Sequence, residues 1–172
     1  GTLVAAPGAA LAGVNPKTVR ALEPALMKVE QSNTSVSYGN RWILKWFRSI
    51  GPGVNPDLEI GLFLGTRTSF RNFPQVDGFL EYRPTRGEPV TLAVLHRFIP
   101  NEGDAWKHTL DVLSRYFEEA LARDPKEPGP SPPAGRIEDL AEGEIPSKAQ
   151  EIIGSYLTSA RRIGERTAQL HL

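Results

Sequence analysis

Short runs rich in β-branched and aromatic residues recur between residues 29 and 100 of the chain. They predict strands around Ser35–Tyr38, Arg41–Arg48, Val76–Arg83 and Pro89–Ile99. The dipeptide Gly39-Asn40 between the first two runs is typical of a tight hairpin turn. This part of the chain is therefore expected to form a small antiparallel sheet.

Helical patterns interrupt these strands once and then follow them. Asn55 and Pro56 supply an N-cap and a first-turn proline for a helix that extends to about Leu64. Asp104 can cap a second helix, and Ser147 with Gln150 forms a capping box for a third. Strands with one embedded helix, followed by helices alone, predict an α+β fold.

Apolar residues recur at three- and four-residue spacing in the last two predicted helices. The second carries Trp106, Leu110, Leu113, Phe117 and Leu121, and the third carries Ile153, Tyr156, Ala160, Ile163, Thr167 and Leu170. The aromatic residues of the second helix are expected to lie in a core. The third pattern reaches Leu172 without a stop signal, so the sequence is expected to be truncated there. Between these two helices, residues 124–135 hold five prolines and predict an exposed loop or linker.

Composition narrows the classes of function. The 172 residues include no cysteine, which excludes disulfides, thiol catalysis and cysteine-ligated zinc. Twenty basic residues balance twenty acidic ones, so neither nucleic acid nor a membrane surface is expected as a partner. No apolar run approaches the roughly 20 residues that cross a bilayer, and no basic region precedes the apolar N-terminus, so a cytoplasmic protein is expected.

The segment Glu30–Arg48 carries the most informative chemistry. Its polar stretch Gln31–Ser35 is expected to form a turn whose hydroxyl and backbone N–H groups can face an anion. Lys45 follows in a strand among apolar residues, where an ammonium needs an anionic partner. Glu59 is a candidate partner, since it lies near the start of the embedded helix and shares a face with Leu62 and Phe63.

This order of elements matches the upper lobe of a protein-kinase-like nucleotide site, where a strand lysine holds ATP phosphates and pairs with a helix glutamate. On spacing alone, the alternative is that Lys45 and Glu59 are solvated surface charges. The three histidines, His96, His108 and His171, are too scattered for a metal site and are expected to have structural or surface roles. Glu102 and Asp104 could form a catalytic carboxylate pair, but helix capping is the better explanation of Asp104.

Four motifs together resemble the maltokinase family, whose members occur alone or fused to trehalose synthase. They are Glu30–Val36, Ile43–Arg48, Asn55–Ile60 and Phe98–Trp106, and the closing Ile163–Leu172 resembles the helix ahead of that family's catalytic loop. The resemblance implies an aminoglycoside-phosphotransferase-like kinase fold. It further implies transfer of the ATP γ-phosphate, with Mg²⁺, to the anomeric hydroxyl of maltose, giving maltose 1-phosphate.

The resemblance also implies roles for individual residues. Ser32, Asn33, Thr34 and Ser35 would lie over the phosphates, replacing the glycine-rich loop of other kinases. Lys45 would contact the phosphates, and Glu59 would orient Lys45. The segment 96–99 would form the hinge, in which Arg97, Phe98 and Ile99 bind the adenine edge through their backbone.

The same resemblance divides the chain into three parts. Residues 1–28 would end an N-terminal cap, residues 29–102 would form the nucleotide-binding lobe, and residues 103–172 would lead toward a second lobe. The His-Gly-Asp catalytic loop with its base, the Mg²⁺ ligands and the sugar pocket are absent from this sequence and expected downstream. The chain alone is therefore expected not to phosphorylate maltose. A non-catalytic regulatory or interaction module attached to a trehalose synthase remains the alternative.

Overall fold

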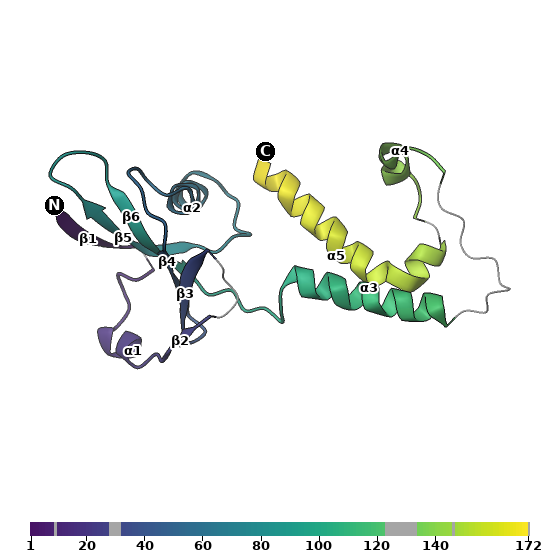
Figure 1. Cartoon of the computed structure of the whole chain (residues 1–172), viewed down its shortest axis with the longest axis horizontal. Coiled ribbons are helices and arrows are strands. Elements are labelled where there is room, and N and C mark those ends of the chain that lie inside the picture. Colours follow the sequence, from purple (N-terminus) through teal and green to yellow (C-terminus); the bar gives the residue numbers. More distant parts are fainter. Residues whose placement is uncertain (9, 28–31, 123–133, 146, 172) are drawn as a thin grey trace. The chain divides into compact units, whose positions relative to one another are not determined.

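The computed structural model describes residues 1–8, 10–27, 32–122, 134–145 and 147–171 (Figure 1). The chain divides into two compact units, Gly1–Pro100 and Asn101–Leu172, which we call the sheet unit and the helical unit. Each unit is described by itself.

Six strands of the described residues form one antiparallel sheet in the sheet unit, in the order β1-β5-β6-β4-β3-β2. The strands are β1 (Thr2–Pro7), β2 (Pro24–Leu26), β3 (Asn33–Tyr38), β4 (Trp42–Phe47), β5 (Val76–Arg83) and β6 (Val90–Arg97). The helices of this unit are α1 (Pro16–Arg20) and α2 (Pro56–Arg67). The predicted α+β class is confirmed, and the four predicted strands are present with small shifts at their ends.

The β3–β4 hairpin turns where the sequence predicts it. Gly39 adopts a left-handed conformation with φ of 54°, which glycine reaches without a steric penalty. Tyr38 then lies opposite Trp42, and this register continues to Ser35 opposite Lys45. The turn thereby sets which residues of β3 share a face with Lys45.

Two strands were not predicted, and both come from the segment that the sequence resemblance assigned to a cap. Strand β1 pairs with β5 at one edge of the sheet, and β2 pairs with β3 at the other. Residues 1–28 therefore contribute both edge strands to the sheet that carries Lys45.

Helix α2 packs against β5 and β6 through one stripe of small and apolar residues. Leu58, Gly61 and Leu64 are the buried positions of this stripe. The approach is closest at Gly61, where an added Cβ would lie 2.5 Å from Val76 Cγ2. Only glycine fits this distance, so α2 lies directly on the sheet.

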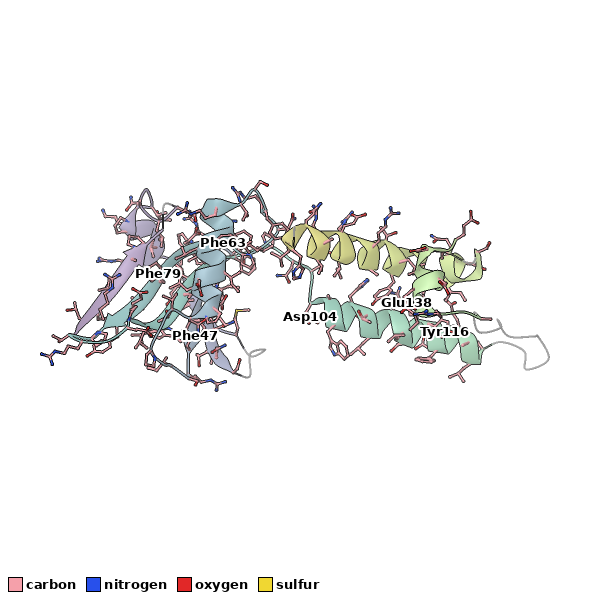
Figure 2. The ribbon with its side chains drawn as sticks, turned by 90° about the horizontal axis from the view of Figure 1, so that it is seen from above. Phe47, Phe63, Phe79, Asp104, Tyr116 and Glu138 are labelled. Carbon is pink, nitrogen blue, oxygen red and sulfur yellow. The ribbon has the colours of Figure 1, made fainter. Side chains whose placement is uncertain are left out.

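The helical unit contains α3 (Ala105–Leu121), α4 (Ile137–Glu142) and α5 (Ser147–His171). Asp104 caps α3 as predicted, because its side chain accepts a hydrogen bond of 2.7 Å from the Lys107 N–H (Figure 2). The predicted single third helix is kinked at Ile153, whose φ is −125°. The kink precedes the pair Gly154-Ser155, a common site of helix bending.

Helices α3 and α5 pack together on a different stripe from the one expected. The buried residue of α3 is Val112, and Thr109 Oγ1 bonds to the Tyr156 hydroxyl at 3.3 Å. Trp106 and Phe117, expected in the core, are 72% and 57% exposed within the described part of the chain. The reason is rotational: the positions turned toward α5 lie on another face of α3 from Trp106 and Phe117.

Most of the predicted proline-rich loop, residues 124–133, lies outside the described residues, as does Gln31, the first residue of the predicted phosphate turn. Within the described helices, no segment has the length and apolar character needed to cross a membrane.

Candidate functional site

Lys45 lies on β4, an interior strand of the sheet, between β3 and β6. Successive side chains of a strand alternate between faces, so Ile43 and Lys45 share one face while Trp42 and Trp46 share the other. Helix α2 covers the face of Lys45, because Asp57 of α2 contacts its ammonium. The Lys45 side chain is 27% exposed, so its charge is partly desolvated.

The start of α2 is built to hold a carboxylate beside Lys45. Asn55 caps the helix by accepting a hydrogen bond of 2.9 Å from the Asp57 N–H. The Asn55 N–H in turn donates to the hydroxyl of Thr91 on β6 at 3.0 Å, and Thr91 is 3% exposed. Pro56 occupies the first helical position, where no N–H is needed. These contacts tie the first turn of α2 to the sheet.

Asp57 lies between two basic side chains. Its Oδ2 is 3.1 Å from Lys45 Nζ, and its Oδ1 is 3.5 Å from His96 Nε2. The hydrogen bond with His96, followed by the contacts with Lys45, lowers the pKa of Asp57 from 3.8 to about 2, although burial opposes this shift. Asp57 is therefore a carboxylate throughout the physiological range.

Glu59 does not occupy the position expected for it. The carboxylate in ion-pair contact with Lys45 is that of Asp57, and Glu59 is exposed. Helical geometry explains the difference, since two residues correspond to about 200° of rotation. Glu59 shares a face with Leu62 and Phe63, but Phe63 is 57% exposed, so this face of α2 points away from the sheet.

A cavity of about 400 Å³ opens beside the Lys45–Asp57 pair. Residues of α2 line it at helical spacing, namely Asp57, Ile60, Gly61 and Leu64. Lys45 and His96 line it from the sheet, and Phe73 and Pro74 close another side. The three ionisable groups therefore meet at one end of a mostly apolar hollow.

The segment expected to cover phosphates is divided by the structure. Residues 33–35 belong to β3 rather than to a turn, and Ser32 is the first described residue before it. Ser35 lies directly opposite Lys45 on the same face and is 4% exposed, whereas Thr34 lies opposite Trp46 on the other face. Asn33 Nδ2 donates to Ser32 Oγ at 3.2 Å. Asn33 and Ser35 therefore share the face of Lys45.

The expected hinge begins at the last residues of β6. The Arg97 N–H donates to the Gln75 carbonyl at 2.8 Å, and the Phe98 N–H donates to the Arg41 carbonyl at 2.9 Å. Both N–H groups are thus used within the sheet unit, and Ile99, 47% exposed, follows them. An adenine ring bound at this segment would therefore have to form its hydrogen bonds with backbone groups other than these two N–H donors.

The Arg97 side chain takes part in a second cluster on the opposite face of the sheet from Lys45. Its guanidinium donates to both oxygens of Asp77, at 2.7 and 3.1 Å, which raises the pKa of Arg97. Trp42 Nε1 donates to the same carboxylate at 2.9 Å, and Asp77 is 3% exposed. This cluster joins β4, β5 and β6 and holds the strand that precedes the hinge.

The sequence singled out Lys45 but not its actual partners. Asp57 belongs to the motif Asn55–Ile60, and the sequence signal for it is its position two residues after the N-cap Asn55. His96 was counted among the hinge residues for its backbone, while its ring faces Asp57. Asp77 carried no sequence signal that distinguished it from Glu81 and Arg83, the other charged residues of its strand.

No protein-family model matches the chain. Among solved structures, the chain is similar to a glucosamine kinase in its crystal form B, with 21% sequence identity and a TM-score of 0.46. The similarity covers 70% of this chain and 26% of the other, so the chain spans about a quarter of the glucosamine kinase chain.

Proposed function

We propose that this chain is the ATP-binding part of a carbohydrate kinase and that maltose is the sugar it serves. The observation that carries the proposal is the Lys45–Asp57 pair, in which an ammonium on an interior strand lies 3.1 Å from a carboxylate in the first turn of α2. Protein kinases use a strand lysine for the nucleotide phosphates and pair it with an acidic residue of the next helix.

The order of elements supports the same proposal. Counted from β2, Lys45 lies on the third strand of an antiparallel meander, and the helix with its acidic partner follows before two further strands. This is the order in which kinases present their phosphate-binding lysine. The acidic residue here is an aspartate in the first turn of the helix, where the glutamate of other kinases has a longer side chain.

Each proposed residue has a defined task in nucleotide binding. Lys45 neutralises phosphate charge, and Asp57 keeps its ammonium in place when no nucleotide is bound. Ser32 to Ser35 would donate hydrogen bonds to phosphate oxygens, with Ser35 nearest to Lys45 in the sheet register. The backbone beyond Phe98 would receive the adenine edge. ATP would supply the phosphoryl group. Mg²⁺, bound by residues outside this chain, would neutralise part of the phosphate charge.

The identity of the sugar rests on the sequence motifs alone. Maltose, the product maltose 1-phosphate and an association with trehalose synthase follow from the resemblance of Glu30–Val36, Ile43–Arg48 and their companion motifs to maltokinases. The catalytic base, the Mg²⁺ ligands and the sugar-binding residues are proposed to belong to the remainder of such an enzyme.

Substitution of Lys45 by methionine tests the nucleotide part of the proposal. Because a hydrogen bond to a charged group contributes about 1.5–3 kcal/mol, Lys45→Met is expected to weaken binding of ATP with Mg²⁺ by at least about tenfold. Isothermal titration calorimetry on the whole chain measures this affinity.

Lys17→Met is the matched control, since Lys17 is exposed on α1 and the same charge is removed. Its ATP affinity should equal that of the unsubstituted chain. Equal affinities for the Lys45 and Lys17 variants would remove Lys45 from the nucleotide site. The absence of ATP binding by the unsubstituted chain would favour the non-catalytic module.

A further inference from the structure

The His96 ring lies between two hydrogen-bond acceptors. Its Nε2 is 3.5 Å from Asp57 Oδ1, and its Nδ1 is 3.4 Å from the Pro74 carbonyl oxygen. A neutral imidazole has one N–H and can donate to only one of them, whereas an imidazolium donates to both. The side chain is 14% exposed, so water replaces these partners poorly. Only a protonated ring could therefore donate to both acceptors at once.

Asp57 distributes its two oxygens between two bases. Oδ2 faces Lys45 and Oδ1 faces His96, so the carboxylate keeps one basic partner when the other moves away. In the proposed function, Lys45 must direct at least one ammonium N–H toward a phosphate oxygen. The Asp57 carboxylate would then depend on His96 for its remaining ionic contact with the sheet.

We propose that His96 is a positioning residue for nucleotide binding: when protonated it holds Asp57 against the sheet and leaves the Lys45 ammonium more available to phosphate. An imidazolium shares the negative charge of Asp57 with Lys45 and adds positive charge near the phosphate position. A neutral His96 leaves Asp57 dependent on Lys45. ATP affinity should therefore be higher when His96 is protonated than when it is neutral. This inference rests on the proposed function for its nucleotide step but not for the His96–Asp57 contact.

The groups around His96 permit a clean test. Lys45 from β4 and Asp57 from α2 are the ionisable residues that share the cavity with it, and its other walls are Pro56, Ile60, Gly61, Leu64, Phe73 and Pro74. Val76 of β5 and Ile43 of β4 lie opposite it in the sheet. Imidazole is the side chain among these that ordinarily titrates between about pH 5 and 8.

The first measurement is ATP affinity at pH 5.5 and pH 8 for the whole chain and for His96→Gln. A glutamine amide can still donate to Asp57, but it cannot take up a proton. The ratio of wild-type to His96→Gln affinity is expected to increase about two- to fivefold from pH 8 to pH 5.5, as for an exposed to half-buried ion pair. Taking the ratio cancels the protonation of ATP itself.

His171→Gln is the control, since His171 is exposed near the end of α5. Its ratio to wild type should not change with pH. A constant ratio for His96→Gln as well would overturn the inference while leaving the proposed function intact. Conversely, an unaffected Lys45→Met variant would overturn the proposed function.

The second measurement needs no nucleotide. Urea unfolding of the wild type, His96→Gln, Asp57→Asn and the double variant gives the coupling between the two positions. We expect the coupling to change the unfolding constant about two- to fivefold at pH 5.5 and to diminish at pH 8, because only a charged imidazole forms an ion pair with Asp57. Additive effects at both pH values would show that His96 does not hold Asp57 and would overturn the inference.

Discussion

At the scale of single residues, Asp57 links the charge balance of the site to the stability of the sheet unit. Its pKa of about 2 lies below the ordinary 3.8, chiefly because of His96 and then Lys45. A carboxyl group whose pKa is lowered on folding stabilises the folded state above its unfolded pKa. That stabilisation is lost as the pH falls from about 4 toward 2, because the folded group then also takes up a proton.

Asp57→Asn should therefore lower the free energy of unfolding at pH 7 by about 1–2 kcal/mol, after allowance for solvent screening at a side chain that is 33% exposed. The difference from wild type should shrink below about pH 4. Urea unfolding, followed by tryptophan fluorescence at pH 7, 4 and 3, measures it. Glu59→Gln removes a charge two residues away on the exposed face and should be neutral. A larger effect at Glu59 than at Asp57 would contradict the assignment of the pair.

At the scale of elements, the position of Asp57 depends on how closely α2 approaches β5. The contact between Gly61 and Val76 leaves no space for a Cβ, since the nearest atom would be 2.5 Å away. Gly65, one helical turn further, has its nearest such neighbour, Gln75 Oε1, at 3.6 Å. Two glycines of one helix therefore offer opposite environments for the same substitution.

Gly61→Ala is expected to lower the free energy of unfolding by about 1–3 kcal/mol, because α2 or Val76 must move. Gly65→Ala should be neutral or stabilise by up to about 1 kcal/mol, since alanine favours a helix more than glycine does. Chemical denaturation of both variants distinguishes these outcomes. If Gly61→Ala also weakens ATP binding while Gly65→Ala does not, the close packing of α2 on β5 determines the nucleotide affinity of the site. Equal stabilities of the two variants would show that the sheet yields easily at Gly61.

At the scale of the whole molecule, the groups of the candidate site belong to a single unit. Lys45, Asp57, His96 and the cavity between them lie within Gly1–Pro100, together with every strand that the structure describes. The buried residues Trp42, Leu58 and Val94 belong to the same unit. The sheet unit thus has its own core and its own hydrogen-bonded sheet.

We expect a polypeptide of residues 1–100 to fold by itself and to keep the Lys45–Asp57 pair. Its urea unfolding, followed through Trp42, which is 5% exposed, should be cooperative and should retain the sensitivity to Asp57→Asn. A comparison with the 172-residue chain is the control. Loss of cooperative unfolding, or of the Asp57 effect, would show that residues 101–172 are needed to form the site.

Local sequence patterns were sufficient for the main elements. The segments that form β3, β4, β5 and β6 are rich enough in β-branched and aromatic residues to be predicted as strands. Gly39 marks the turn between β3 and β4. The N-caps Asn55 and Asp104 predicted the starts of α2 and α3. The edge strands β1 and β2 were not predicted. Strand β2 has only three residues, and β1 forms by pairing with β5, which is distant in sequence.

For the site, the sequence by itself determined that Lys45 needs an anionic partner, since a charge among apolar strand residues is costly without one. Which carboxylate meets it was decided only by tertiary structure. Asp57 and Glu59 are only two positions apart in the sequence, but the packing of α2 on the sheet at Gly61 places Asp57 toward β4 and Glu59 toward solvent. The same packing brings His96 from β6 to Asp57, a contact between distant segments that no local pattern encodes.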